Sequence, residues 1–309
     1  MPSLIIRHMQ GIDCQQMKYT EIEVKSILNK VNVHDDWFGL TYNMNLYRGC
    51  EHQCIYCDTR SECYQIENFQ KEVLVKVNGV NLLRNTLPKK KLIGTIGFGS
   101  MNDPYTYAEA KYGLTGQALE VIAEQGWPVH IITKSDMVLK DMATLIRINA
   151  TMAQVSFTIT TVDDDLAKKI EPGAPSPSRR LKGMKILAEN GIRTGITMMP
   201  VLPFILDNQL NLTMLVEAAH ANNAAYILPV FGMTLRDRQR EHYYSALDQN
   251  FPGIRQKYED TFGEKYSAMS IREEFLEGLF TRLCGQYGIA TRIEKYPSRQ
   301  RIAQLGLFD

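Results

Sequence analysis

Three of the six cysteines in this chain fall within eight residues, in the pattern Cys50-x3-Cys54-x2-Cys57. Thiolates at this spacing are typical of metal ligands, because one short loop can present all of them to a metal. Three thiolates can bind three irons of a cubane cluster and leave the fourth iron open for a small ligand. The residues leave two alternatives open: a zinc site completed by Cys63 or His52, and a closed four-cysteine cluster that uses Cys63.

Length, composition and charge exclude several classes of protein. The chain has 309 residues, 44% of them hydrophobic and 22% charged, so it can form a sizeable core and is not a disordered protein. No apolar run is long enough to span a bilayer, and residues 1–15 lack the apolar region of a secretory signal. We therefore expect a cytoplasmic protein without disulfides. The net charge is only +1, so a polyanionic partner needs a local basic surface.

Short strand-like runs alternate with helical patterns along most of the chain. This alternation predicts an α/β fold with a parallel sheet. Six strand–helix units are too few for a complete barrel, so we expect a partial (β/α)6 TIM-like barrel. The expected strands are 40–47, 92–98, 129–133, 153–160, 193–199 and 225–231. The expected helices are 81–87, 107–125, 137–149, 177–190 and 209–222.

Two regions of different character flank the expected barrel. Residues 1–40 are interpreted as an N-terminal extension without an assigned role, and the barrel itself is expected to span residues 41–234. Residues 235–309 are expected to form a mainly helical C-terminal region that ends in a tail. Its expected elements are helices over 237–247, 253–262 and 271–287, and a strand over 289–296.

Unusual polar motifs follow the expected strands at the edge where parallel sheets place their chemistry. The cysteine run follows the first strand, and residues 100–105 (Ser-Met-Asn-Asp-Pro-Tyr) follow the second. Lys134 and Ser135 follow the third strand, and residues 158–165 follow the fourth. We expect these motifs to form one site, in which His52 is interpreted as a solvent-facing residue.

The cysteine run, with Tyr56 in its aromatic position, resembles the signature of the radical S-adenosylmethionine (radical SAM) superfamily. The resemblance implies a [4Fe-4S] cluster held by Cys50, Cys54 and Cys57, whose open iron binds S-adenosylmethionine. One electron, from a reductant of the flavodoxin or ferredoxin type, then cleaves the cofactor. The resulting 5′-deoxyadenosyl radical abstracts a hydrogen atom from the substrate.

Further motifs are similar to the spore photoproduct lyase-like branch, which is often labelled "DNA repair photolyase". They are residues 47–57, 102–105 with Glu109, 133–135, and 171–176 with 179–181. The resemblance implies lyase chemistry on a nucleic-acid lesion or a modified nucleotide. Two alternatives remain open: radical modification of a peptide or small metabolite, and a zinc-stabilised module without catalysis.

The same resemblance implies which residues bind the cofactor. Ser100 and Lys134 would hold the methionine carboxylate, and Thr158 would contact the ribose. Tyr56 would lie near the adenine, and two residues of the fourth unit would shape the pocket. The implied cofactor-binding residues are Tyr56, Ser100, Asn102, Asp103, Lys134, Thr158, Glu171 and Arg180.

The chain departs from the lyase at the hydrogen donor. The lyase has a cysteine donor after its second strand, where this chain has Ser100. The O–H bond of a hydroxyl is too strong to replace a thiol, so repair by the same route is not expected. The candidate donors are Tyr105 and Cys63, with Tyr107, Cys14 and Cys284 as further possibilities.

Two segments suggest macromolecular partners: an apolar peptide near the C-terminus and a basic run of lysines. Gln304, Leu305, Leu307 and Phe308 resemble the peptide by which bacterial DNA-maintenance proteins dock on the sliding clamp. The alternative is that these apolar residues fold back onto the chain's own core. Three consecutive lysines at 89–91 are interpreted as a solvated turn, with DNA contact as the alternative.

Overall fold

The core of the fold is a seven-stranded sheet in a computed structural model that describes residues 17–31, 37–64, 66, 69 and 71–300. In spatial order the strands are β11 (Tyr226–Pro229), β10 (Arg193–Met198), β9 (Ala153–Thr158), β8 (Val129–Thr133), β7 (Ile96–Phe98), β3 (Tyr42–Met44) and β2 (Leu28–Lys30). Neighbours from β11 to β3 are parallel, and the edge strand β2 is antiparallel to β3. Six parallel strands confirm the predicted partial (β/α)6 barrel.

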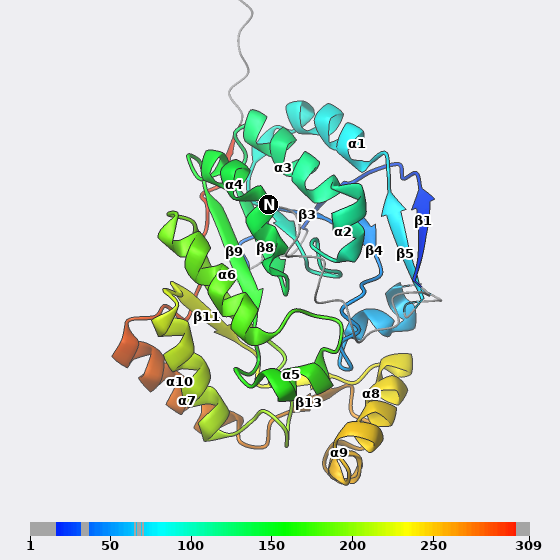
Figure 1. Cartoon of the computed structure of the whole chain (residues 1–309), viewed down its shortest axis with the longest axis vertical. Helices are drawn as coiled ribbons and strands as arrows, with labels where there is room; N and C mark the ends of the chain where they lie inside the picture. Colours follow the sequence, from blue (N-terminus) through cyan, green and yellow to red (C-terminus); the bar gives the residue numbers. More distant parts are fainter. Residues whose placement is uncertain (1–16, 32–36, 65, 67–68, 70, 301–309) are drawn as a thin grey trace, which may run out of the picture.

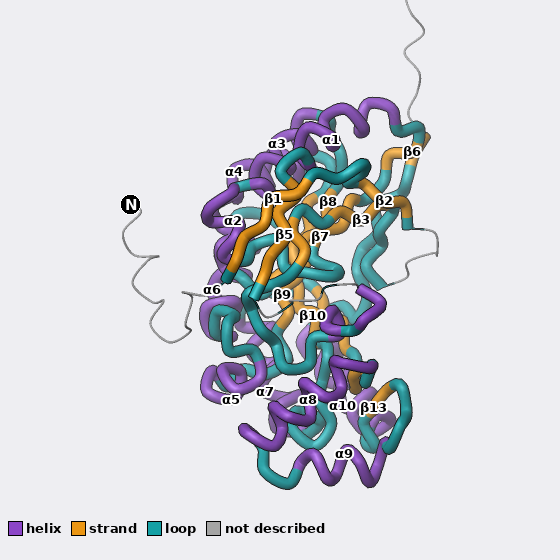
Figure 2. Tube along the Cα trace, turned by 90° about the vertical axis from the view of Figure 1, so that its right-hand side faces the viewer, coloured by secondary structure: helices purple, strands orange, loops and turns teal. Residues whose placement is uncertain are grey.

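Helices cover the outer face of this sheet (Figure 1). They are α1 (Gly79–Thr86), α3 (Leu114–Glu124), α4 (Met142–Ile148), α6 (Pro177–Glu189) and α7 (Gln209–Ala221). In α6, the apolar side chains of Leu181, Met184 and Leu187 are buried, while Lys182 and Lys185 are exposed. All six residues of β9 are buried, as expected for a parallel strand that is covered on both faces. Figure 2 shows the strands running through the middle of the molecule.

A second, three-stranded sheet holds the chain where it enters the cysteine run. Its order is β1 (Lys18–Ile22), β5 (Glu72–Lys76) and β4 (Tyr47–Arg48). Gly49 follows β4 with φ +100°, and a Cβ there would lie 2.6 Å from the Glu72 carbonyl oxygen. The N-terminal extension therefore has a structural role, because it contributes β1 to this sheet and β2 to the central sheet.

The C-terminal region is mainly helical, as expected. Its helices are α8 (Asp237–Asn250), α9 (Ile254–Phe262) and α10 (Glu273–Tyr287). Helix α10 packs on α7, and α8 packs on the short 3-10 helix η3 (Asp58–Arg60) that follows the cysteines (Figure 1). Strand β12 (Gly232–Thr234) pairs with β13 (Ser267–Met269), and β14 (Arg299–Gln300) pairs with β6 (Leu92–Ile93). No helix among the described residues could cross a membrane.

Several sequence-based expectations differ from the structure. The strand expected over 92–98 is divided into β6 and β7, which belong to different sheets, and the helix expected over 137–149 begins with the 3-10 helix Asp136–Asp141 before α4. The helix expected over 107–125 is divided into α2 (Tyr107–Tyr112) and α3, because Gly113 between them has φ +63°. The strand expected over 289–296 is wrong, since only Ala290 forms an isolated bridge, to Tyr226. The strand expected over 40–47 is shorter, and its last residue belongs to β4 of the second sheet.

Candidate functional site

The three closely spaced cysteines lie on a compact loop between β4 and η3. Cys50 and Cys54 are buried and Cys57 is half-buried, and all three are free thiols. The loop turns at Gln53, which has φ +53°, and at Cys57, whose N–H donates to the Cys54 carbonyl at 3.2 Å. Burial raises the pKa of all three thiols, to about 12 for Cys54. A bound metal must therefore provide the positive charge that keeps them as thiolates.

The donor set fits an iron–sulfur cluster. A single zinc ion needs ligands that converge on one point. In a cubane cluster each cysteine binds its own iron, so the three sulfur atoms stand apart around the cluster. Cys50, Cys54 and Cys57 supply three soft sulfur donors on one loop, which is the donor set that such a cluster uses.

A buried polar network lies beside the cysteine loop and contains four of the residues expected in the pocket. The Tyr56 hydroxyl donates to the carboxylate of Glu171, which also forms an ion pair with Arg180. The side chains of Glu171 and Arg180 are only 2% and 1% exposed. Arg180 also donates to the Thr158 carbonyl at 2.8 Å and to the Pro175 carbonyl at 2.7 Å. The carboxyl end of β9 is thus joined to the cysteine loop.

Lys134 adds a second cation to this network. Its Nζ lies 5.6 Å from the centroid of the Tyr56 ring. Burial acts to lower the pKa of Lys134, but the negative charges of Cys54 and Glu171 outweigh burial and raise it. Burial likewise acts to raise the pKa of Glu171, but Arg180 and Lys134 lower it. Lys134 and Arg180 therefore face the carboxylates of Glu171 and Asp103, and the ammonium group of Lys134 keeps its positive charge for contact with an anionic group.

Asp103 positions Lys134. Its carboxylate accepts hydrogen bonds from the Thr133 hydroxyl at 2.7 Å, the Tyr105 N–H at 2.9 Å and the Lys134 N–H at 2.6 Å. Asp103 thus ties the carboxyl end of β7 to that of β8. Asp103 follows β7, as the sequence predicts, and its hydrogen bonds hold the loops after β7 and β8 together.

His52 is buried, so its interpretation as a solvent-facing residue is wrong. Its side chain is 4% exposed, and Nδ1 lies 3.4 Å from the Asp103 carboxylate. Burial lowers the pKa of His52 to about 4, because desolvation outweighs the attraction to Asp103. His52 therefore stays neutral at neutral pH and links the cysteine loop to the loop after β7.

The loop between α5 (Asp164–Ile170) and α6 supports the cysteine loop directly. The Gly173 N–H donates to the His52 carbonyl at 2.9 Å, and the Ile55 N–H donates to the Ile170 carbonyl at 2.9 Å. A Cβ at Gly173 would lie 2.1 Å from the Glu51 carbonyl oxygen. The segment 171–176, noticed in the sequence as a motif, is therefore the backbone support of the cysteines.

The C-terminal region also contacts the cysteine loop. Gln239 of α8 donates from Nε2 to the Tyr56 carbonyl at 3.0 Å. The Asp237 carboxylate accepts from the Ser61 hydroxyl at 2.9 Å and from the Glu62 N–H at 3.1 Å. Helix α8 is therefore part of the wall around the site, although it lies outside the six strand–helix units.

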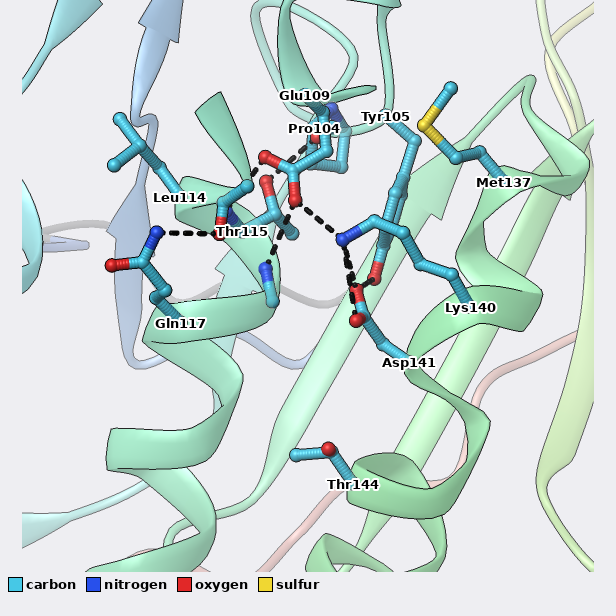
Figure 3. A network of polar contacts seen from close by, with 12 residues as sticks. Pro104, Tyr105, Glu109, Leu114, Thr115, Gln117, Met137, Lys140, Asp141 and Thr144 are labelled. Carbon is cyan, nitrogen blue, oxygen red and sulfur yellow. Dashed lines mark hydrogen bonds and ion pairs between the residues drawn. The ribbon is translucent and has the colours of Figure 1, made fainter. Parts of the chain in front are cut away.

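The remaining expected site residues lie in different surroundings. Ser100 is exposed and its hydroxyl accepts from the Asn43 amide at 2.6 Å, while Asn102 is buried. Tyr105 is buried, and its hydroxyl donates to Asp141 at 2.9 Å. In Figure 3, Tyr105 and Asp141 belong to a separate polar network with Lys140 and Glu109.

The thiols outside the cysteine loop differ in their exposure to solvent. Cys63 is exposed on the 3-10 helix η4 (Glu62–Tyr64), with its sulfur 3.3 Å from both the Ser61 hydroxyl and Arg236 Nη1. Cys284 is fully buried in α10. Cys14 lies outside the described residues.

The chain belongs to the radical SAM superfamily. The superfamily pattern matches residues 44–215, which is more than half of the chain. The cluster and cofactor of this superfamily are a [4Fe-4S] cluster and S-adenosylmethionine. The chain is therefore a radical SAM enzyme, and the zinc alternative is set aside.

The chain is also similar to uncharacterized proteins of two organisms and, in its fold, to a solved structure. An uncharacterized protein of Methanocaldococcus jannaschii is 30% identical over 239 residues, which cover 77% of this chain and 85% of that protein. An uncharacterized protein of Mycobacterium bovis is 28% identical over 282 residues, 88% and 82% of the two chains. The structure of spore photoproduct lyase complexed with dinucleoside spore photoproduct has a TM-score of 0.63 at 14% identity, over 87% of this chain and 79% of the lyase. This last similarity confirms the predicted likeness to the lyase at the level of the fold.

Replacing Gly173 by alanine should loosen the cysteine loop, because the new methyl group would overlap the Glu51 carbonyl. We expect a loss of about 1–3 kcal/mol in unfolding free energy and a lower iron content after reconstitution. Gly285→Ala on α10 is the control, since a Cβ there meets no heavy atom within 4 Å. Urea unfolding and iron analysis compare the two variants. Equal behaviour of the two would contradict the supporting role of the 171–176 segment.

Arg60 is a residue that the sequence interpretation missed. The residue is 7% exposed, and its guanidinium donates to the Gln53 side chain at 3.0 Å and lies 4.7 Å from the centroid of the Phe69 ring. Phe69 packs with Cys50 and Cys57. Arg60 Nε is buried and has no hydrogen-bond partner among the described residues. A buried cation with an unused N–H therefore lies beside the three thiols.

Arg60→Gln should make the cluster harder to reduce. Removing a positive charge beside the cluster disfavours the reduced, more negative state. We expect the midpoint potential to fall by about 60 mV, equivalent to a tenfold change in the one-electron equilibrium. Arg84→Gln, which removes an exposed arginine on α1, should leave the potential unchanged. A redox titration followed by electron paramagnetic resonance (EPR) measures both, and equal potentials would rule out this role for Arg60.

Proposed function

We propose that this radical SAM enzyme acts on a nucleic-acid lesion or a modified nucleotide. The main support is that the similarity to spore photoproduct lyase covers 87% of this chain, well beyond the superfamily region of residues 44–215. The lyase structure includes a dinucleoside spore photoproduct. A Pseudomonas phage M6 protein named radical SAM Nalpha-GlyT isomerase is also 30% identical over 134 residues, 43% of this chain and 28% of that protein.

The proposed cofactor contacts follow from charge and position. When bound, the [4Fe-4S] cluster and S-adenosylmethionine supply a radical that abstracts a hydrogen atom from the substrate. Lys134 stays protonated and would hold the methionine carboxylate, with Ser100 at the same edge. Glu171, held ionised by Arg180, accepts from the Tyr56 hydroxyl and so fixes the ring that would lie near the adenine.

Thr158 and Asn102 complete the proposed set of cofactor contacts. The Thr158 hydroxyl lies 2.9 Å from the Thr197 hydroxyl at the carboxyl ends of β9 and β10, where it would contact the ribose. Asn102 is buried beside Asp103 in the loop after β7.

The final hydrogen donor is proposed to differ from that of the lyase. Tyr105 and Cys63 are the two candidates. Burial and the Asp141 carboxylate raise the pKa of Tyr105, so its phenol keeps the hydrogen atom that a donor needs. Cys63 has the weaker bond, since an S–H gives up a hydrogen atom more readily than a phenol, and its thiol is exposed beside η3.

The substrate class is tested by the stimulation of cofactor cleavage. Reconstituted enzyme with dithionite should release 5′-deoxyadenosine faster with ultraviolet-damaged DNA than with undamaged DNA. Lys134→Gln should abolish the release, whereas Lys185→Gln on the exposed face of α6 should not. Equal rates with both DNA samples, and stimulation only by peptides or small metabolites, would favour the alternative substrates.

The other partners and the domain division remain part of the proposal. A flavodoxin- or ferredoxin-type protein would supply the electron in the cytoplasm. The domains are proposed as 1–40, 41–234 and 235–309. Residues 304–308 lie outside the described residues, so docking on the sliding clamp is tested by truncation before Gln304. Unchanged capture of the truncated chain by the clamp would contradict this docking.

A further inference from the structure

Three segments that are distant in the sequence meet at the short pairing between β6 and β14. The register places Arg299 opposite Ile93 and Gln300 opposite Leu92. The Tyr42 hydroxyl donates to the Leu92 carbonyl at 3.0 Å, which adds β3 to this group. The pairing therefore brings Arg299 and Gln300 beside the strand that follows the lysines at 89–91, while Lys295 lies farther along the same C-terminal segment, against Gly39.

Strand β2 brings a further cation to the same place. Lys30 is directly opposite Tyr42 in the pairing of β2 with β3. Lys90 lies over the Tyr42 ring, with Nζ 5.4 Å from the ring centroid. We call this group of cations the β6–β14 basic surface. It consists of Lys30, Lys89, Lys90, Lys91, Lys295 and Arg299.

The basic surface is a local feature of an almost neutral protein. Residues 28–31, 89–93 and 295–300 contain these six cations and no aspartate or glutamate, and the neighbouring Glu294 forms an ion pair with Arg193, whereas the whole chain has a net charge of +1. Five of the six side chains are exposed, and Lys90 is half-buried. This is the concentrated positive charge that a polyanionic partner requires from such a chain.

The basic surface is separate from the candidate site. It lies at the amino ends of β3 and β7, where Tyr42 is paired with Ile96. Lys134 and Asp103 follow the carboxyl ends of β8 and β7, so they lie at the opposite ends of the parallel strands. The six cations therefore do not bind the cofactor or the reacting part of the substrate.

We propose that the β6–β14 basic surface binds the phosphate backbone of duplex DNA. Flexible lysines neutralise phosphates without reading sequence and release condensed counterions. The run of three lysines, in which Lys89 and Lys91 are exposed, is flanked by Arg299 and Lys30 and offers several such contacts. This inference rests on the proposed function and extends it, because the surface would keep the enzyme on DNA while the site at the opposite edge acts on a lesion.

A charge-neutralised variant and a matched control test the surface. The variant is Lys89→Gln/Lys90→Gln/Lys91→Gln, and the control is Lys182→Gln/Lys185→Gln/Lys257→Gln, whose three lysines are exposed on α6 and α9. Both lower the net charge by three. Fluorescence anisotropy with a labelled, undamaged duplex of about 20 base pairs measures affinity from about 50 to 200 mM salt.

The basic-surface variant should bind the duplex about tenfold more weakly at low salt. The plot of log association constant against log salt concentration should become less steep, with a slope smaller in magnitude by about two to three. The control should keep a slope close to that of the wild-type chain. A second variant, Lys295→Gln/Arg299→Gln, should also lower the slope, by about one to two. Equal loss in the first variant and the control would overturn the inference.

A short substrate separates this inference from the proposed function. A damaged dinucleoside is too short to span from the site to the opposite edge of the sheet. It should stimulate release of 5′-deoxyadenosine equally in the wild-type chain and the basic-surface variant, while damaged duplex DNA stimulates the variant less. A wild-type chain that responds to the dinucleoside but does not bind the duplex would overturn the surface alone. No response to either damaged substrate, in a wild-type chain that still binds the duplex, would overturn the proposed function alone.

Discussion

A Cys54→Ala chain loses the [4Fe-4S] cluster and, with it, all reductive cleavage of S-adenosylmethionine. Cys54 is buried, and it lies close enough to Lys134 and Glu171 for their charges to act on its pKa, so a water molecule or a surface thiol cannot take its place. Iron should fall from about four per reconstituted chain to near zero. Iron and sulfide analysis, with chromatography of 5′-deoxyadenosine, measures both effects.

Cys63→Ala is the matched control for this loss. Cys63 is an exposed thiol only six residues from Cys57, and it was the fourth ligand in the closed-cluster alternative. Its removal should leave the iron content and the cleavage of S-adenosylmethionine without substrate unchanged. Loss of iron in this variant would contradict an open, three-cysteine cluster. A defect only in product formation would instead support Cys63 as the final hydrogen donor.

Arg180→Met should destabilise the cluster-free protein by about 3–5 kcal/mol at pH 7. The change leaves the Glu171 carboxylate buried, 2% exposed, without its ion-pair partner. Arg179→Met is the control, because Arg179 forms an exposed ion pair with Asp136 and should cost at most about 1 kcal/mol. Urea unfolding at several pH values compares the two variants. Equal losses would contradict a central role for the buried pair.

The pH dependence of this effect has a definite sign. In the wild-type chain the pKa of Glu171 is lowered, so its contribution to stability is present above the unfolded pKa, about 4.3, and is lost as the pH falls through the folded pKa. Without Arg180 the buried carboxyl group should have a raised pKa and become neutral first. The difference between Arg180→Met and wild type should therefore narrow as the pH is lowered from 7 toward 4. A difference that does not depend on pH would indicate lost packing rather than lost charge compensation.

Local patterns predicted the regular elements well. Strand β8 has the expected bounds, since the apolar run Val129–Thr133 lies between Pro128 and the polar Lys134. Helix α6 begins at Pro177 as expected, because Pro suits the first turn of a helix. Both signals depend on neighbouring residues alone, so they can be interpreted without knowledge of the fold.

Long-range contacts account for the errors and omissions. Tyr47 continues the pattern of the first strand, but its partner is Val75 of β5, which no local pattern identifies. His52 is polar and in a loop, yet Asp103 and the Gly173 segment bury it. Arg60 differs from a surface arginine only through its contacts with Gln53 and Phe69. Tertiary contacts, and not residue type, decide the roles of these residues.

The cysteine signature predicted the cofactor chemistry, but the surroundings of the cysteines were only partly predictable. Tyr56, Glu171 and Arg180 were expected in one pocket because of the resemblance, and the structure joins them through side-chain contacts. Tyr105 was expected near the same pocket, but its hydroxyl is directed to Asp141 in another network (Figure 3). The end of a strand determines where the backbone of a residue lies, but tertiary packing determines the direction of its side chain.

The most direct test of the proposed substrate class follows one hydrogen atom from DNA to the cofactor. Reconstituted enzyme is reduced anaerobically with dithionite in the presence of S-adenosylmethionine and of ultraviolet-damaged DNA whose thymidines are deuterated. Mass spectrometry then measures deuterium in 5′-deoxyadenosine. A radical SAM enzyme that acts on a nucleic-acid lesion should transfer deuterium into 5′-deoxyadenosine, and only with the damaged DNA. Release of unlabelled 5′-deoxyadenosine at the same rate with and without damaged DNA would contradict the proposed substrate class.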